Sequence, residues 1–175
     1  GRYIWHISTE VIQRANMISL QTEVVANHDI NFRGCITMAR GDSLFVSNNE
    51  DLYCCNNDGL YLYGSMPQEE IISSMLDTED GGFLISTRCG KIYKDDGRCN
   101  RQQIHNCKKP IRKLFADSKG RLWYGCMTYT SQLKYAGVRL FMWDFLNGKE
   151  PVDLGFLGTK KRTISVTAEF NIFDD

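Results

Sequence analysis

The stretch Ile111–Cys126, IRKLFADSKGRLWYGC, contains two short apolar runs separated by a polar turn that holds Asp117 and Gly120. A diluted copy, ISSMLDTEDGGFLIST, occupies Ile72–Thr87, so the two copies start 39 residues apart. Both halves of each copy have the length and composition of a β-strand. A hairpin that recurs at a fixed spacing indicates a repeat architecture, which is therefore the first hypothesis to test.

The apolar pair of this hairpin recurs along the chain. Aligning the pair in GRLWYG places four large side chains in register, at spacings of 40, 39 and 39 residues: Trp5, Phe45, Leu84 and Trp123. A second short strand follows each pair, in EVIQR, EDLYCC, GKIYKD and VRLFMWD, and weaker strand candidates lie before and after. The sequence thus predicts about four repeats of 39–40 residues, each with four short strands, and no long amphipathic helix.

Four-stranded sheets that repeat about every 40 residues are typical of a β-propeller. The second strand of each repeat is a continuous apolar run, whereas a sheet with one wet face alternates apolar and polar residues. Continuous runs indicate that both faces are covered by neighbouring blades, and a β-sandwich has no reason to keep a period of 39. We therefore predict an all-β propeller of four-stranded antiparallel blades, with Trp5, Phe45, Leu84 and Trp123 in the core between blades.

The repeats are expected at residues 1–34, 35–70, 71–109 and 110–162, with 163–175 as the first strand of a following blade. The chain opens on a second-strand pattern and ends on a first-strand pattern, TISVTAEFNIFDD. We expect a fragment of a larger propeller. The alternative, in which the two ends combine into one mixed blade and close a four-bladed ring, stays open.

Composition narrows the partners and the compartment. The 21 basic and 21 acidic side chains cancel, which argues against nucleic acid or anionic lipid as a partner. No apolar run approaches the roughly 18–20 residues of a membrane span, and GRYIWHISTE lacks the apolar region of a signal peptide. The seven cysteines include no C-x-x-C pair, so we expect most of them to pack as small hydrophobic residues, with no metal and no cofactor.

The hairpin resembles the two-component regulator propeller repeat. Six residues match that repeat position by position: Asp117, Gly120, Leu122, Trp123, Tyr124 and Gly125. Cys126 stands where the family has Thr, and the other three repeats match loosely. The resemblance implies an extracytoplasmic or periplasmic sensor region of a hybrid two-component histidine kinase, often one that responds to oligosaccharides. The chain itself contains no kinase motif.

No catalytic grouping emerges from the repeat register. His6, His28 and His105 fall at different points of the repeat, so we expect this segment not to be an enzyme. A propeller lyase or glycosidase is one alternative. A protein-interaction propeller is the other, although the signatures of kelch or WD repeats do not recur at matching positions.

The loops between the second and third strands are the candidate ligand site. They read SNNE, TRCG and, in the last repeat, the long MTYTSQLKYAG. Loop insertions on one face of a repeat protein often mark its binding surface. Tyr129 and Tyr135 could stack on sugar rings, while the polar partners for hydroxyl or carboxylate groups would be Lys134, Arg88, Asn48 and Asn49. The alternative is a loop that packs on a neighbouring blade, or on a second subunit in a homodimer.

Overall fold

A computed structural model describes residues 3–32, 34–129 and 135–157, together with the backbone but not the side chains of 135 and 136. The described chain is all-β apart from one short 3₁₀ helix, η1 (Phe145–Asn147). Its strands form one three-stranded and three four-stranded antiparallel sheets, here called blades 1 to 4.

Blade 1 contains β1 (Tyr3–Ile7), β2 (Val11–Asn16) and β3 (Thr22–Asn27). Blade 2 contains β4 (Thr37–Arg40), β5 (Ser43–Asn48), β6 (Asp51–Asn56) and β7 (Gly59–Ser65). Blade 3 contains β8 (Ile72–Asp77), β9 (Phe83–Thr87), β10 (Lys91–Asp95) and β11 (Arg101–Asn106). Blade 4 contains β12 (Ile111–Ala116), β13 (Leu122–Tyr129), β14 (Tyr135–Trp143) and β15 (Val152–Leu157).

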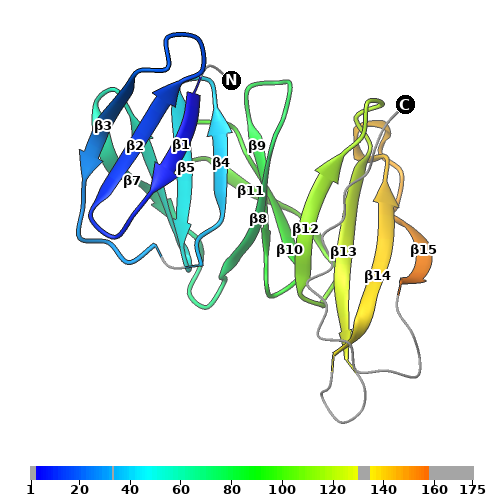
Figure 1. Cartoon of the computed structure of the whole chain (residues 1–175). Helices are drawn as coiled ribbons and strands as arrows, with labels where there is room; N and C mark the ends of the chain where they lie inside the picture. Colours follow the sequence, from blue (N-terminus) through cyan, green and yellow to red (C-terminus); the bar gives the residue numbers. More distant parts are fainter. Residues whose placement is uncertain (1–2, 33, 130–134, 158–175) are drawn as a thin grey trace.

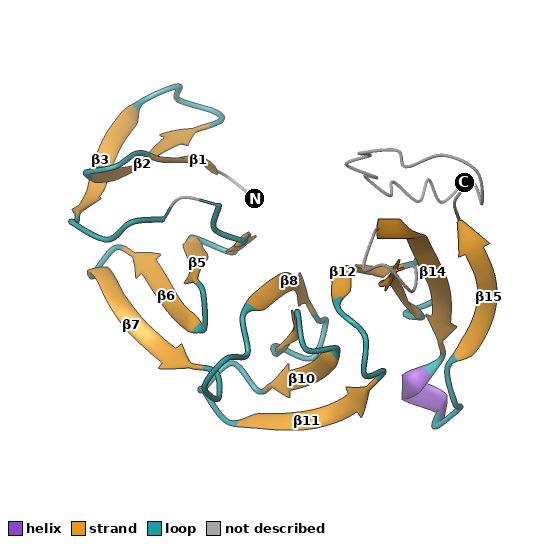
Figure 2. Cartoon of the chain, turned by 90° about the horizontal axis from the view of Figure 1, so that it is seen from below, coloured by secondary structure: helices purple, strands orange, loops and turns teal. Residues whose placement is uncertain are grey.

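The blades stand side by side around an open arc (Figures 1 and 2). Within blades 2 to 4 the strands pair in chain order, each with its sequence neighbour. In Figure 2 the outer strands β7, β11 and β15 follow the circumference, and the first strands lie toward the centre. The predicted fold class is therefore confirmed: these are propeller blades. The predicted repeat boundaries are not tested by this arrangement, and residues 163–175 lie outside the described residues.

The continuous apolar runs of the second strands divide their side chains between two neighbouring blades. Leu44 packs with Ile12 of blade 1, whereas Phe45 packs with Phe83 of blade 3. In β9, Leu84 in turn faces blade 4. Consecutive residues of a strand point to opposite faces, so an uninterrupted apolar run is what a strand covered on both sides needs. Full burial of each such side chain contributes roughly 1.5–3 kcal/mol.

The four residues aligned by the repeat, Trp5, Phe45, Leu84 and Trp123, differ in how deeply they are buried. Phe45 and Leu84 are buried between blades, and Trp5 is half-buried against the cluster between blades 1 and 2. Trp123 is half-buried as well. It alternates with Leu122 and Tyr124, which both face blade 3, so its ring lies on the opposite face of blade 4. A core position between two blades stays a prediction for Trp123.

In the described ranges, no helix has the length and the apolar character that a membrane span requires.

Candidate ligand-binding face

The turns between second and third strands lie at one end of the blades, beside the connections between blades. In Figure 1 this is the lower end, where the chain runs from β3 to β4. Backbone hydrogen bonds join the two kinds of segment. The Met66 N–H donates to the Glu50 carbonyl at 2.8 Å, and the Ile72 N–H donates to the Asn49 carbonyl at 3.0 Å. Each turn is thereby fixed against the connection that leads into the next blade.

Four of the six sequence-predicted ligand residues have described side chains at this end. Asn48 ends β5, Asn49 follows it with a φ of 57°, Arg88 follows β9, and Tyr129 ends β13. They come from three successive blades. Arg88 is exposed, and Tyr129 exposes 47% of its surface. Lys134 lies outside the described residues, and Tyr135 is placed at the start of β14 by its backbone only.

Three of these side chains are unengaged. Among the described residues, no side-chain hydrogen bond or ion pair involves Asn48, Asn49 or Arg88. The Tyr129 hydroxyl lies 3.7 Å from the Met127 sulfur. This end therefore presents free amide groups in blade 2, a free guanidinium group in blade 3 and an exposed aromatic ring in blade 4.

A buried carboxylate at the same end was not predicted. Glu70, only 5% exposed, lies in the connection from β7 to β8. Its Oε2 accepts from the Tyr93 hydroxyl at 2.7 Å, and its Oε1 pairs with the Lys91 ammonium. The hydrogen bond to Glu70 raises the pKa of Lys91. Since both carboxylate oxygens are engaged with residues of β10, Glu70 holds the connection against that strand.

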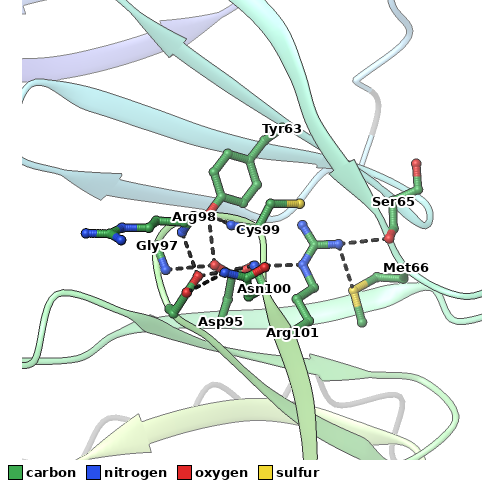
Figure 3. Close-up of polar contacts among 10 residues, drawn as sticks. Tyr63, Ser65, Met66, Asp95, Gly97, Arg98, Cys99, Asn100 and Arg101 are labelled. Carbon is green, nitrogen blue, oxygen red and sulfur yellow. Dashed lines mark hydrogen bonds and ion pairs between the residues drawn. The ribbon is translucent and has the colours of Figure 1, made fainter.

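A second buried carboxylate, Asp95, joins the outer parts of blades 2 and 3 (Figure 3). The Asp95 side chain is fully buried. Its Oδ1 accepts from the Tyr63 hydroxyl at 2.8 Å and from the Gly97 N–H at 2.9 Å. Its Oδ2 accepts from Arg101 Nε at 2.8 Å. Burial and then the bond to Asp95 raise the pKa of Tyr63.

Arg101 extends this network across the boundary between the blades. Its Nη1 donates to the Ser65 carbonyl of β7 at 2.9 Å (Figure 3). Gly64 permits the close approach, because a Cβ there would lie 2.4 Å from the Cys99 sulfur. Because both carboxylate oxygens of Asp95 accept hydrogen bonds, one of them from Tyr63 of blade 2, the arrangement is suited to holding blades 2 and 3 together.

The opposite end of the blades carries a cavity of about 270 Å³ between blades 3 and 4. Leu84 and Leu122 are among its apolar lining residues, with Phe145 and Leu146 from the segment around η1. The aspartates at this cavity are paired with cations: Asp77 with Arg40, Asp80 with Lys94, and Asp117 with Arg121. The hydrogen bond from Lys94 lowers the pKa of Asp80 to about 2. The cavity is thus apolar inside and has an ion-paired rim.

The described residues do not assemble a metal site. No three His, Cys, Asp or Glu side chains within them gather as ligands for a metal ion. Of the three histidines, His105 lies between blades 3 and 4 and bonds the Tyr124 hydroxyl at 3.0 Å. His6 and His28 lie in blade 1 and in the connection after it.

Comparison with known proteins supports the fold. No protein-family model and no curated protein matches the sequence. Solved structures do match. The chain is similar to YCF48 bound to D1 peptide, with a TM-score of 0.58 and 13% identity over 87% of this chain and 50% of that one. It is similar to streptogramin B lyase, with a TM-score of 0.55 and 11% identity over 87% of this chain and 65% of that one.

A third similar structure is an extracellular domain. It is described as the extracellular domain of the one-component system BT4673 from B. thetaiotaomicron, with a TM-score of 0.59 and 16% identity over 90% of this chain and 21% of that one. These neighbours are β-propeller proteins. The chain has a propeller fold. At such identities the likeness shows the fold alone, and the chain spans half the length of the YCF48 chain. Membership of the two-component regulator propeller family stays a prediction.

Proposed function

We propose that this chain is a ligand-sensing propeller segment of an extracytoplasmic, periplasmic two-component sensor, and that it responds to oligosaccharides without being an enzyme itself. Two lines support the proposal. The Asp117-to-Gly125 motif resembles the repeat of that sensor family. The propeller likeness includes an extracellular domain of a signalling protein. Further blades of the parent chain would be natural partners of the segment.

The observation that carries the proposal is the free polar side chains at the turn end. Asn48, Asn49 and Arg88 are not used by the described part of the fold, and Tyr129 offers an exposed ring at the same end of blade 4. A pyranose has one apolar face that packs on an aromatic ring, and its hydroxyls need donors and acceptors placed beside that ring. The residue types match this requirement.

The test is a calorimetric titration of the chain with a panel of neutral and acidic oligosaccharides. Arg88→Ala and Tyr129→Ala should each weaken binding by about 10-fold or more and leave the melting temperature unchanged, because exposed side chains contribute little to the core. Arg98→Ala is the matched control, since Arg98 is an exposed arginine in the β10–β11 turn at the opposite end. If Arg88→Ala and Arg98→Ala bind the panel equally well, this end of the blades is not the site.

A protein-interaction module is the second candidate, and the apolar cavity between blades 3 and 4 favours it. A space of about 270 Å³ lined by Leu84 and Leu122 could take one apolar side chain of a peptide. Substitution of Leu146, which is 67% exposed at this cavity, separates the two candidates. Leu146→Asp should abolish peptide binding under this second function and leave oligosaccharide binding intact. A homodimer through the turn end would instead appear as a concentration-dependent mass that Tyr129→Ala lowers.

A further inference from the structure

Two cysteine thiols from adjacent blades face each other. Cys107 follows β11 of blade 3, and Cys126 lies within β13 of blade 4. The Cys126 thiol donates a hydrogen bond to the Cys107 sulfur, with the two sulfur atoms 3.0 Å apart. A disulfide bond is about 2.05 Å long, so the sulfurs need to approach by only about 1 Å.

The backbone around each thiol is held in place. The Cys107 N–H donates to the Gly90 carbonyl at 2.9 Å, and Cys126 is paired with Ile111 across β12 and β13. A Cβ on Gly90 would lie 2.5 Å from the Lys109 carbonyl oxygen, so the chain passes very close here. The facing thiols are therefore fixed by the blades themselves and not by a loose loop.

The two thiols differ in access and acidity. Cys126 is fully buried, whereas Cys107 is partly exposed. The hydrogen bond from the Cys126 thiol stabilises the Cys107 thiolate and lowers the pKa of Cys107 to about 7. The same contact, together with burial, raises the pKa of Cys126. Cys107 is thus the thiol that is accessible to an external reagent. Its lowered pKa favours the thiolate, which is the reactive form.

The other cysteines lack this arrangement within the described chain. Cys54 and Cys55 are neighbours in β6 and belong to different interblade clusters, so they point apart. Cys89 donates to the Glu69 carbonyl at 3.3 Å. Cys89 and Cys99 are exposed in turns and are the exceptions to the packing expected for most of the cysteines.

We propose that Cys107 and Cys126 form a reversible disulfide that joins blade 3 to blade 4. The oxidant is a disulfide, either a small molecule or the active site of a thiol–disulfide oxidoreductase. The Cys107 thiolate attacks one oxidant sulfur, which forms a mixed disulfide and releases the first thiol. Cys126 loses its proton to water and attacks the Cys107 sulfur, which releases the second thiol. The protein loses two electrons and two protons, and the oxidant disulfide becomes two thiols.

The bond would fix the connection between blades 3 and 4 at the turn end. It closes the chain from residue 107 to residue 126 and so restricts the unfolded state. Lys109, whose carbonyl accepts from the Cys107 thiol at 3.1 Å, lies in the same connection. Oxidation would therefore stiffen the boundary of these blades beside the Arg88 turn, independently of any ligand.

The test uses the reduced chain treated with oxidised glutathione, then alkylated, digested with trypsin and analysed by mass spectrometry. Tryptic cleavage separates the two cysteines into peptides 102–108 and 122–134, each with a single cysteine. A cross-linked pair of these peptides is expected. The melting temperature should rise by roughly 10 °C on oxidation and return on addition of dithiothreitol. Alkylation of both cysteines after oxidation, or their linkage to other cysteines instead, would overturn the proposal.

Single substitutions test the order of attack. With Cys126→Ser, oxidised glutathione should leave a stable adduct on Cys107, because the resolving thiol is absent. With Cys107→Ser, Cys126 should stay unmodified, because it is buried. Cys89→Ser is the matched control and should keep both the cross-link and the melting shift. An adduct on Cys126 in the Cys107→Ser chain would contradict the assigned roles.

Discussion

The indole N–H of Trp123 donates to Asp117 Oδ2 at 2.9 Å across the turn between β12 and β13. The same carboxylate accepts from Arg121 Nε at 2.6 Å and from the backbone N–H groups of Lys119 and Arg121. Burial opposes ionisation of Asp117, but the bonds from Trp123 and Arg121 prevail and hold its pKa below the usual range. The aspartate and the tryptophan of the repeat motif therefore act together to fix one turn, which explains their spacing.

Removal of this carboxylate should destabilise blade 4. Asp117→Ala leaves the indole and two backbone donors without their acceptor, and a loss of about 1–3 kcal/mol in the free energy of unfolding is expected. Urea denaturation measures it. Asp58→Ala, at an exposed aspartate in the β6–β7 turn, should change stability by less than about 0.5 kcal/mol. Equal effects of the two substitutions would show that the turn does not depend on Asp117.

Truncation of the register residues should distinguish covered from uncovered blade faces. Phe45→Ala removes a ring that is 6% exposed between blades 2 and 3, so it should cost about 3–5 kcal/mol. Trp123→Ala should cost less, because the ring is half-buried on the face of blade 4 away from blade 3. Thermal or urea unfolding of both variants gives the comparison. An equal or larger loss for Trp123→Ala would mean that a further part of the protein covers that face.

The buried ion pair between Asp95 and Arg101 should respond strongly to removal of one partner. Arg101→Ala leaves the fully buried Asp95 carboxylate without its cation and should cost about 3–5 kcal/mol. Arg98→Ala, in the same turn region but exposed, serves as the control and should be nearly neutral. Removal of both charges in Asp95→Asn, Arg101→Met should restore part of the loss. If the double variant is no more stable than Arg101→Ala, the penalty does not come from the unpaired carboxylate.

His105 should make the protein less stable in mild acid. Burial lowers the pKa of His105 below its ordinary value of about 6.5. The unfolded chain therefore binds a proton at His105 before the folded chain does, and stability falls as the pH drops from about 6.5 through the lower folded-state pKa. Above about pH 6.5 neither the folded nor the unfolded chain binds this proton, so His105 no longer lowers the stability. His105→Gln should flatten the decline of unfolding free energy between pH 7 and pH 5, measured by urea denaturation at each pH. An unchanged pH profile would contradict the assignment.

The sequence could predict the fold because each blade repeats the same physical requirement. A strand covered on both faces must be apolar throughout, and the buried residues Leu44, Phe83 and Leu122 repeat at a constant spacing of 39 residues. The interblade contacts carry no such period. Tyr63 and Asp95 lie 32 positions apart, and Cys107 and Cys126 lie 19 apart, in no recognisable motif. Those pairs arise from how one particular blade packs on the next, which a single sequence does not encode as a pattern.

The candidate ligand residues show the same division. Asn49 and Arg88 lie in turns between second and third strands, whereas Asn48 and Tyr129 are the last residues of the second strands β5 and β13. Whether they serve a common ligand depends on the side-chain arrangement across three blades, and their role stays a prediction. Glu70 and Lys91 lie at the same end of the blades, but their side chains pair with each other and so hold the fold together. A polar residue at this end therefore need not serve a ligand.

Hydrogen–deuterium exchange with and without a bound oligosaccharide tests the central claim most directly, because it reports where on the chain the ligand acts. The account predicts slower exchange in the turns at residues 48–50 and 88–90 once the chain is saturated, with the β10–β11 turn at 96–100 unchanged. Protection confined to 96–100 and the other turns of the opposite end, with 48–50 and 88–90 unaffected, would contradict it.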